Sequence, residues 1–449
     1  MREGGRRVTT ALAGAVVAGA VVVAGLAGVP TPAAAAAPPP TAQPTALPPA
    51  PSAAPSTLPL LVPPTSELPL LVPTSTVPAT ASAPAPAPTS SVVPTTGPSA
   101  PSGVTISGLD LHDGTMLQSG GVDLLYGTMY GCGFEWGVSS PWCGFGVSEA
   151  STPAGPWSAP TRLFAPTDVS PFTGTTWQAI CGDSGAGCFN PRMLHRSGWG
   201  ADDGAWILWF NAPDDFARTR ANAYYAMECA GPTGPCGGAG RTTTKPSLHD
   251  CTDNGDFSLV PDDPRPPMML CTMADQTLAS ERLSASGTAG AGGGSHDLAG
   301  LTNTEAPGAY RDPSTGTWIL TYSDPNCGYC AGAPTGYATA PGLDGPWTAP
   351  ANTNPDWGAP PSGRRAISAT SCGGQSRTVV TLSGQAYQLI DLWLGTRNET
   401  RAGIRLEPLV YRGASAPGTP LQAFAPWTCG AVEGGPHGTG HRGSAASPG

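Results

Sequence analysis

An internal repeat between residues 122 and 347 constrains the fold of this 449-residue chain more than any other feature. In each copy, a hydrophobic run that resembles a β-strand is followed later by a second run, which ends in a Gly-Pro-Trp-like turn. The second runs are Val147–Trp157, Tyr337–Trp347 and, in degenerate form, Tyr225–Cys236. A repeated strand-and-turn unit indicates that the chain folds into several similar small sheets.

The first run of each copy predicts one strand per unit, and two weaker matches bring the number to five. These runs are Val122–Gly127, Trp206–Asn211, Met268–Thr272, Trp318–Ser323 and Tyr387–Asp391. Gly, Pro, Asp and Asn clusters separate them, and no helical periodicity extends beyond two turns. We therefore expect an all-β fold, a five-bladed β-propeller around a central channel. A two-sheet sandwich is the alternative, but it gives no reason for one turn to recur in register with one strand.

The N-terminal residues 1–37 have the composition of a targeting segment. Arg2, Arg6 and Arg7 precede an apolar Ala/Val/Gly run and several small-residue cleavage sites, which predicts a secretory signal peptide. An uncleaved membrane anchor is the alternative, because a run of about 19 apolar residues just spans a bilayer. We expect a secreted, extracellular protein that is free of the membrane after cleavage.

Two further segments lack the composition of a packed core. Residues 38–104 are rich in Pro, Ala, Ser and Thr, and this predicts a disordered, extended linker. Residues 431–449 are rich in Gly, Ser and Ala and predict a disordered tail. The folded domain is therefore expected over residues 105–430.

All twelve cysteines follow the linker, at positions 132, 143, 181, 188, 229, 236, 251, 271, 327, 330, 372 and 429. An even number of cysteines beside an export signal predicts disulfides that brace the loops. Cys327-x-x-Cys330 and His249-x-Cys251 have the spacing of zinc ligands, but no second pair completes a site, so we expect no metal there. The net charge of −10, with only 21 Lys and Arg, argues against a nucleic-acid partner. We expect a monomer.

Polar residues precede the five expected strands at corresponding places. The segments are Leu111–Gly114, Phe189–Arg192, Asp256–Asp263, Glu305–Pro307 and Gly374–Arg377. A propeller directs the starts of its inner strands toward one mouth of the channel. Glycoside hydrolysis needs paired carboxyl groups, which Asp113, Asp256 and Glu305 would supply; the alternative for each is a surface turn. Several tryptophans would either stack on sugars or pack in the core, namely Trp136, Trp142, Trp177, Trp209 and Trp393.

The segment Gly182–Gly187 resembles the nucleophile loop of trypsin-like serine proteases. The histidine and aspartate partners of that catalytic triad have no matching segments in the chain. A small disulfide loop between Cys181 and Cys188 is the simpler interpretation.

Most of residues 105–412 resemble glycoside hydrolase family 43, especially the branch of exo-β-1,3-galactanases. Five segments carry the resemblance: Leu111–Gly127, Asp256–Asp263, Glu305–Ser323, Tyr337–Trp347 and Cys372–Trp393. The family implies a five-bladed propeller and an inverting single displacement that requires no cofactor. It also implies a structural calcium ion in some members.

The resemblance implies a role for several residues of this chain. Glu305 corresponds to the general acid, Asp256 to the residue that tunes the pKa of that acid, and Gln375 to a residue that holds water. Asp113 replaces a glycine, and would be either a restored base or a turn residue. The expected substrate-binding residues are His112, Asn190, Arg192, Tyr322 and Trp393.

One departure from the family pattern leaves two possible functions, an active hydrolase and an inactive binding protein. Where the branch has Glu-Arg-Pro, this chain has Phe189-Asn190-Pro191, so a carboxylate is missing. We expect a secreted glycoside hydrolase that acts on plant or cell-wall polysaccharide, with galactan-, arabinan- or xylan-type side chains. The alternative is a catalytically inactive propeller that binds carbohydrate.

Overall fold

The computed structural model describes residues 102–214, 222–351, 362–413 and 423–430. The predicted signal peptide, nearly all of the linker, and the tail lie outside these residues. The folded domain begins with β1 (Val104–Ile106), so its first strand starts at the last residue of the predicted linker. Within the described residues, no helix is long and apolar enough to cross a membrane.

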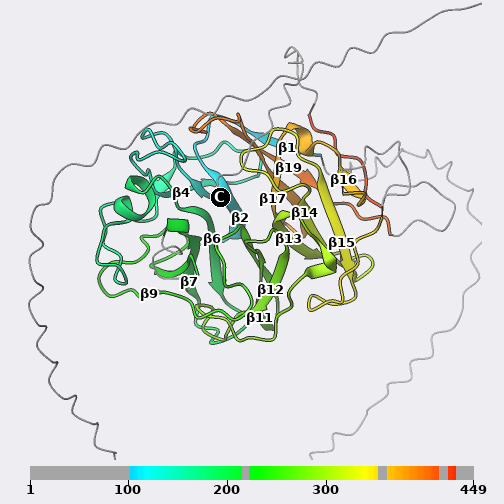
Figure 1. The fold of residues 1–449 in the computed structure, drawn as a ribbon, viewed down its shortest axis with the longest axis horizontal. Helices are drawn as coiled ribbons and strands as arrows, with labels where there is room; N and C mark the ends of the chain where they lie inside the picture. Colours follow the sequence, from blue (N-terminus) through cyan, green and yellow to red (C-terminus); the bar gives the residue numbers. More distant parts are fainter. Residues whose placement is uncertain (1–101, 215–221, 352–361, 414–422, 431–449) are drawn as a thin grey trace, which may run out of the picture. The chain divides into compact units, whose positions relative to one another are not determined.

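The domain is a five-bladed β-propeller (Figure 1), and each blade is an antiparallel sheet. Blade 1 contains β2 (His112–Ser119), β3 (Val122–Thr128), β4 (Phe145–Ala150) and β5 (Thr161–Arg162). Blade 2 contains β6 (Phe189–Arg196), β7 (Ala205–Asn211), β8 (Tyr224–Cys229) and β9 (Thr243–Thr244). Blade 3 contains β10 (Phe257–Asp262), β11 (Arg265–Thr272) and β12 (Leu278–Arg282).

Blade 4 contains β13 (Glu305–Arg311), β14 (Trp318–Ser323), β15 (Thr335–Ala340) and β16 (Ala366–Ser368). Blade 5 contains β17 (Gln375–Leu382), β18 (Gln385–Leu392), β19 (Gly403–Pro408) and the N-terminal strand β1. Short helical turns lie at η1 (Gln178–Asp183), η2 (Leu298–Gly300) and η4 (Ser371–Gly373). The strands β2, β6, β10, β13 and β17 contact one another in this order and close into a ring, so they are the inner strands.

The sequence repeat is confirmed as the repeat of the blades. All five expected strands are second strands of their blades: β3, β7, β11, β14 and β18. The Gly-Pro turn follows the third strand in blades 1, 2 and 4, and the Gly155–Pro156, Gly234–Pro235 and Gly345–Pro346 peptide bonds are all cis. The sandwich alternative is wrong.

Five hydrophobic clusters fill the interfaces between neighbouring blades. Phe210 of blade 2 packs in the cluster shared with blade 1, and Leu406 of blade 5 packs in another cluster shared with blade 1. The remaining clusters join blades 2 and 3, blades 3 and 4, and blades 4 and 5. Each blade is therefore apolar on both faces, as a sheet between two others must be.

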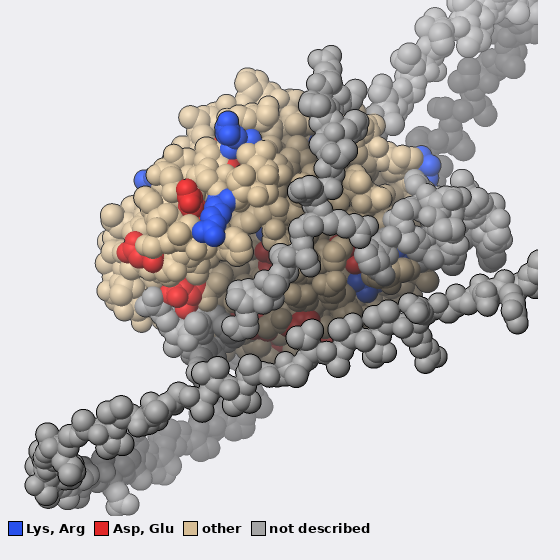
Figure 2. Space-filling view, turned by 45° about the horizontal axis from the view of Figure 1, so that its top comes forward, with Lys and Arg blue, Asp and Glu red and all other residues tan. Residues whose placement is uncertain are grey.

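On the face shown in Figure 2, the visible charged side chains are sparse and of mixed sign.

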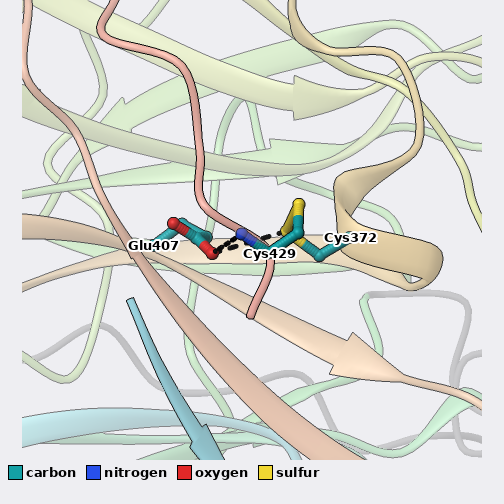
Figure 3. A group of neighbouring side chains, drawn as sticks. All are labelled: Cys372, Glu407 and Cys429. Atoms are coloured by element: carbon teal, nitrogen blue, oxygen red, sulfur yellow. Dashed lines mark hydrogen bonds between the residues drawn. A yellow bond between two sulfur atoms is a disulfide. The ribbon is translucent and has the colours of Figure 1, made fainter. Parts of the chain in front are cut away.

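All twelve cysteines form disulfides, as predicted. The pairs are Cys132–Cys143, Cys181–Cys188, Cys229–Cys236, Cys251–Cys271, Cys327–Cys330 and Cys372–Cys429. The zinc interpretation is therefore wrong for Cys327, Cys330 and Cys251, because a disulfide sulfur is not a thiolate ligand. The same holds where Cys372 and Cys429 lie beside Glu407 (Figure 3).

The N-terminal strand closes the ring, which the sequence pattern did not indicate. β1 pairs with β19, with Ile106 opposite Ile404. Across this seam, the Arg405 guanidinium donates to Thr105 Oγ1 at 2.6 Å, and Arg405 also contacts the Glu407 carboxylate at 2.6 Å. Blade 5 is thus built from both ends of the domain.

We predict that Ile106→Ala lowers the free energy of unfolding by about 2–5 kcal/mol, because it removes a buried aliphatic side chain from the cluster between blades 5 and 1. The measurement is denaturant unfolding with disulfides intact. Val169→Ala, at a side chain that is 58% exposed, serves as the control. A loss below about 0.5 kcal/mol for Ile106→Ala, the range of surface substitutions, would show that β1 does not hold the ring closed.

Candidate active site

A cavity of about 490 Å³ lies at the end of the channel where the inner strands begin. All five blades contribute to its lining, through Asp113, Asn190, Asp256, Glu305 and Gln375. Four of these residues are among the first two of an inner strand, and Asp256 immediately precedes β10. The structure therefore brings together the polar segments that the sequence predicted at one channel mouth.

A β-bulge at the start of β2, β6 and β13 shapes this end of the channel. In each strand the register shifts after the first residue. The second residue has a positive φ, at Asp113 (52°), Asn190 (57°) and Ala306 (54°). Asn and Asp tolerate this left-handed conformation better than most residues, and prolines occur at bulges because they donate no ladder hydrogen bond. The Asn190-Pro191 and Ala306-Pro307 pairs fit this geometry.

Arg377 joins polar groups of four blades. Its guanidinium contacts both carboxylate oxygens of Asp256, at 2.9 and 3.1 Å, and donates to Asn190 Oδ1 at 3.0 Å. It also lies 3.5 Å from Asp391, whose carboxylate accepts from the backbone N–H of Asp113. Arg377 was not among the site residues predicted from the sequence. Its position two residues after Gln375 was the available signal, because alternate residues of a strand share one face.

Both the nitrogen and the oxygen of the Asn190 side-chain amide form hydrogen bonds within the protein. Its Nδ2 donates to Asp256 at 2.8 Å, and its Oδ1 accepts from both Arg192 and Arg377. Asn190 therefore supplies a neutral donor to the carboxylate of Asp256, whereas the missing family carboxylate corresponds to Phe189.

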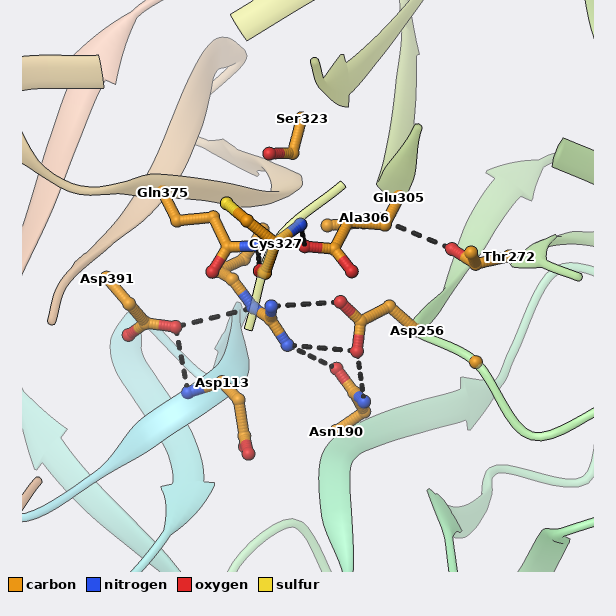
Figure 4. Close-up of polar contacts among 12 residues, drawn as sticks. Asp113, Asn190, Asp256, Thr272, Glu305, Ala306, Ser323, Cys327, Gln375 and Asp391 are labelled. Atoms are coloured by element: carbon orange, nitrogen blue, oxygen red, sulfur yellow. Dashed lines mark hydrogen bonds and ion pairs between the residues drawn. The ribbon is translucent and has the colours of Figure 1, made fainter. Parts of the chain in front are cut away.

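The Glu305 carboxyl group faces Asp256 in the cavity (Figure 4). Its Oε1 accepts hydrogen bonds from the backbone N–H of Cys327, at 2.8 Å, and from the side chain of Gln375. Burial, and next the negative charge of Asp256, raise the pKa of Glu305 to about 8, against the opposing effect of Cys327, Arg377 and Gln375. Glu305 therefore carries a proton at neutral pH, which is the state of a general acid.

Asp113 is fully buried, and its carboxyl group points away from Glu305 and Asp256 (Figure 4). Its Oδ1 accepts from Thr128 at 2.8 Å. Burial raises the pKa of Asp113 to about 7, although Arg377 and Thr128 oppose the shift. Two carboxyl groups in different surroundings thus titrate close to neutral pH.

The structure separates the expected substrate-binding residues. Asn190 and Trp393 line the cavity, and Trp393 Nε1 donates to Gln375 Oε1 at 2.9 Å. Arg192 is buried and donates to the backbone oxygen of Asp113, so it supports the bulge without lining the cavity. His112 is fully buried against Tyr130 and Trp393.

Tyr322 was expected to bind substrate, but it does not line the cavity. It is fully buried in the cluster between blades 3 and 4, and its hydroxyl donates to Tyr337 O at 3.4 Å. Tyr322 lies in the second strand of its blade, between blade faces, rather than at the start of an inner strand.

The tryptophans also separate. Trp142, Trp177 and Trp209 are fully buried in the interfaces between blades, whereas Trp136 lines the cavity and is 45% exposed. The sequence left open whether each tryptophan packs in the core or is available for stacking on a sugar. Trp142, Trp177 and Trp209 pack in the core, whereas Trp136 is exposed in the cavity.

Calcium does not fit among the described residues at this end of the channel. The ion takes six to eight oxygen ligands. Asp256 and Asp391 already face the Arg377 guanidinium, and the Arg192 guanidinium lies against the backbone oxygen of Asp113. The two arginines thus supply the positive charge that a cation would bring.

We predict that Asp256→Asn lowers the pKa of Glu305. The change removes a negative charge that raises this pKa, and it frees Arg377, whose positive charge lowers it. Titration of the Glu305 carboxyl group by infrared or ¹³C NMR spectroscopy measures the shift. Asp203→Asn, at an exposed loop position, should leave the pKa of Glu305 unchanged. An unchanged or higher pKa in Asp256→Asn would contradict the coupling.

No protein-family model and no curated protein match this chain. Solved structures do. An exo-β-1,3-galactanase from Clostridium thermocellum matches with a TM-score of 0.50 and 15% identity, over 69% of this chain and 64% of that one. A candidate exo-β-1,3-galactanase from Bifidobacterium bifidum s17 matches with a TM-score of 0.51 and 14% identity, over 72% and 93%.

The exo-β-1,3-galactanase from Phanerochaete chrysosporium, in complex with β-1,3-galactotriose, has a TM-score of 0.49 and 16% identity, over 68% of this chain and 64% of that one. The chain thus spans less than two thirds of the length of the Phanerochaete and Clostridium proteins. At these identities the likeness establishes the fold. The domain is a five-bladed β-propeller of the kind found in the exo-β-1,3-galactanases, as the resemblance to glycoside hydrolase family 43 implied.

Proposed function

We propose that this protein is a secreted, inverting glycoside hydrolase with Glu305 as its general acid. The observation that carries the proposal is the buried carboxyl group of Glu305, with its raised pKa, beside the ion-paired carboxylate of Asp256 in a cavity of about 490 Å³. The substrate class is a plant or cell-wall polysaccharide, with galactan-type linkages first and arabinan- or xylan-type side chains second. The pairing of every cysteine supports export, because disulfides persist in oxidising compartments.

The hydrogen bonds of Glu305 indicate which oxygen carries its proton. Oε1 already accepts from Cys327 and Gln375, so the proton belongs on Oε2. In the proposed reaction, Oε2–H protonates the glycosidic oxygen as the C–O bond breaks. Asp256 keeps this proton in place before the reaction, because its negative charge disfavours ionisation of Glu305.

Water activation falls to Asp113 in this proposal. The side chain of Gln375 donates to Glu305 and to Cys327 O, and a neutral amide takes no proton, so Gln375 orients its neighbours rather than acting as a base. Among the described residues, Asp113 is the one carboxyl group of the cavity lining besides Asp256 and Glu305; in the reaction its carboxyl group, which here accepts from Thr128, would turn toward the cavity. An inverting mechanism needs acid and base on opposite faces of the sugar. Asp113 would accept the proton of the attacking water, which adds to the anomeric carbon.

A catalytically inactive, carbohydrate-binding propeller is the second candidate. It is favoured by Phe189, which stands where the galactanase branch has the carboxylate of its Glu-Arg-Pro segment. It also fits the engagement of Asp256 with Arg377 and Asn190, which leaves this carboxylate tied within the protein. Hydrolysis distinguishes the two candidates. No cofactor is proposed, and the protein would act as a monomer.

We predict that Glu305→Gln lowers sugar release at least about 100-fold, because an amide does not give up a proton near neutral pH and so cannot act as a general acid. Reducing-sugar release from β-1,3-galactan, arabinan and xylan is the measurement. Glu149→Gln, at an exposed position of β4, is the matched control and should retain full activity. Equal activity of Glu305→Gln and the parent would reject the acid assignment. No release by the parent from any of the three would favour the binding propeller.

The pH profile tests the acid and the base together. Glu305 must be protonated, so activity should be lost as pH rises through about 8. Asp113 must be ionised, so activity should be lost as pH falls through about 7. We predict a narrow bell in kcat/KM with its maximum between these values. Full activity at pH 5 would exclude Asp113 as the base, and full activity at pH 10 would exclude Glu305 as the acid.

A further inference from the structure

Trp136 is the largest of the strongly exposed apolar side chains among the described residues, and it lies in the lining of the candidate active site. An indole that is 45% exposed forgoes much of the free energy that its burial would give. The other exposed apolar aromatic side chain, that of Phe172, lies outside the cavity. Trp136 therefore presents an exposed aromatic face to whatever enters the cavity.

Three aromatic rings connect the exposed rim of the cavity with its acid. The Trp136 ring meets the edge of Tyr329 at a centroid distance of 5.4 Å, and Tyr329 meets Trp393 at 4.9 Å. Trp393 is 4% exposed and donates to Gln375, which in turn donates to Glu305. We call Trp136, Tyr329 and Trp393 the aromatic wall. Exposure is greatest at Trp136 and least at Trp393, beside the catalytic groups.

The loop that carries Trp136 is fastened in place. The Cys132–Cys143 disulfide closes it, and the backbone N–H of Trp136 donates to Arg397 O at 3.0 Å. Asn398 adds two hydrogen bonds from its side chain to backbone oxygens of the same loop, those of Tyr130 and Phe134. The indole is thus held in position before any ligand arrives, which reduces the entropy lost on binding.

We infer that Trp136 forms a second sugar subsite at the mouth of the cavity, where a pyranose unit of a neutral oligosaccharide stacks its apolar C–H face on the indole. The buried Asn190 and Arg377 line the inner part of the cavity and are hydrogen-bonded to each other, and the terminal unit of the chain is placed against them. The terminal unit lies among the polar groups, and the next unit leaves past Trp136. The inference rests on the proposed function, since it takes the same cavity as a sugar site. It adds that a second linked unit strengthens binding through its contact with Trp136.

The test measures binding in the non-cleaving Glu305→Gln protein, by calorimetry with galactose, β-1,3-galactobiose and β-1,3-galactotriose. Adding Trp136→Ala should weaken binding of the two oligosaccharides about tenfold and leave that of galactose unchanged. Trp136→Phe should retain part of the affinity, because it keeps an aromatic face. Phe172→Ala, which removes an exposed ring outside the cavity, should change nothing. Thermal unfolding of each variant confirms that it is folded.

The outcomes separate this inference from the proposed function. Equal oligosaccharide affinity with and without Trp136 would overturn the subsite, even if Glu305→Gln has abolished hydrolysis. Failure of the Glu305→Gln protein to bind any of the three sugars would overturn it as well. If the parent hydrolyses nothing, but Trp136→Ala still weakens binding of galactobiose and galactotriose, the subsite stands and the hydrolase proposal fails.

Discussion

The buried guanidinium of Arg377 is the interaction on which the candidate site depends. A buried charge costs several kcal/mol unless it is paired. Arg377 is paired with Asp256 and Asp391, and it also holds Asn190. These contacts join blades 5, 3 and 2, and Asp391 extends them to blade 1 through the backbone N–H of Asp113. The network does more to define one geometry than to add stability, because removing any member leaves another buried group unpaired.

The acid strength of Glu305 follows from this network. Arg377 is paired with the Asp256 carboxylate, and the charge of Asp256 is the largest electrostatic reason for the raised pKa of Glu305 after burial. Asn190 supports the same carboxylate by donating to it. The family carboxylate that this chain lacks corresponds to the neighbouring residue, Phe189, so Asn190 serves Asp256 as a neutral donor and does not replace that carboxylate.

Much of the fold could be predicted from the sequence, because it arises from local patterns. The repeated strand and its Gly-Pro turn indicated five blades, and the polar segments before those strands indicated one channel mouth. Glu305, Asp256 and Gln375 meet there because equivalent positions in a radial repeat converge. Tyr322 did not follow this rule, since it belongs to a second strand, whose side chains lie between blades. Arg377 was missed because an arginine in a strand has no distinctive signature until its partners are known.

The sequence by itself determined the all-β repeat, the full set of cysteines for disulfides and the chemical groups available to the channel. The tertiary structure alone decided that β1 completes blade 5, that Arg377 pairs with Asp256 and Asp391, and that Trp136 is exposed while Trp142 is buried. The physical reason is distance along the chain. Strand periodicity and turns involve neighbouring residues, whereas the Asp113–Asp391 hydrogen bond joins residues 278 positions apart. Such a contact exists only after the ring has closed.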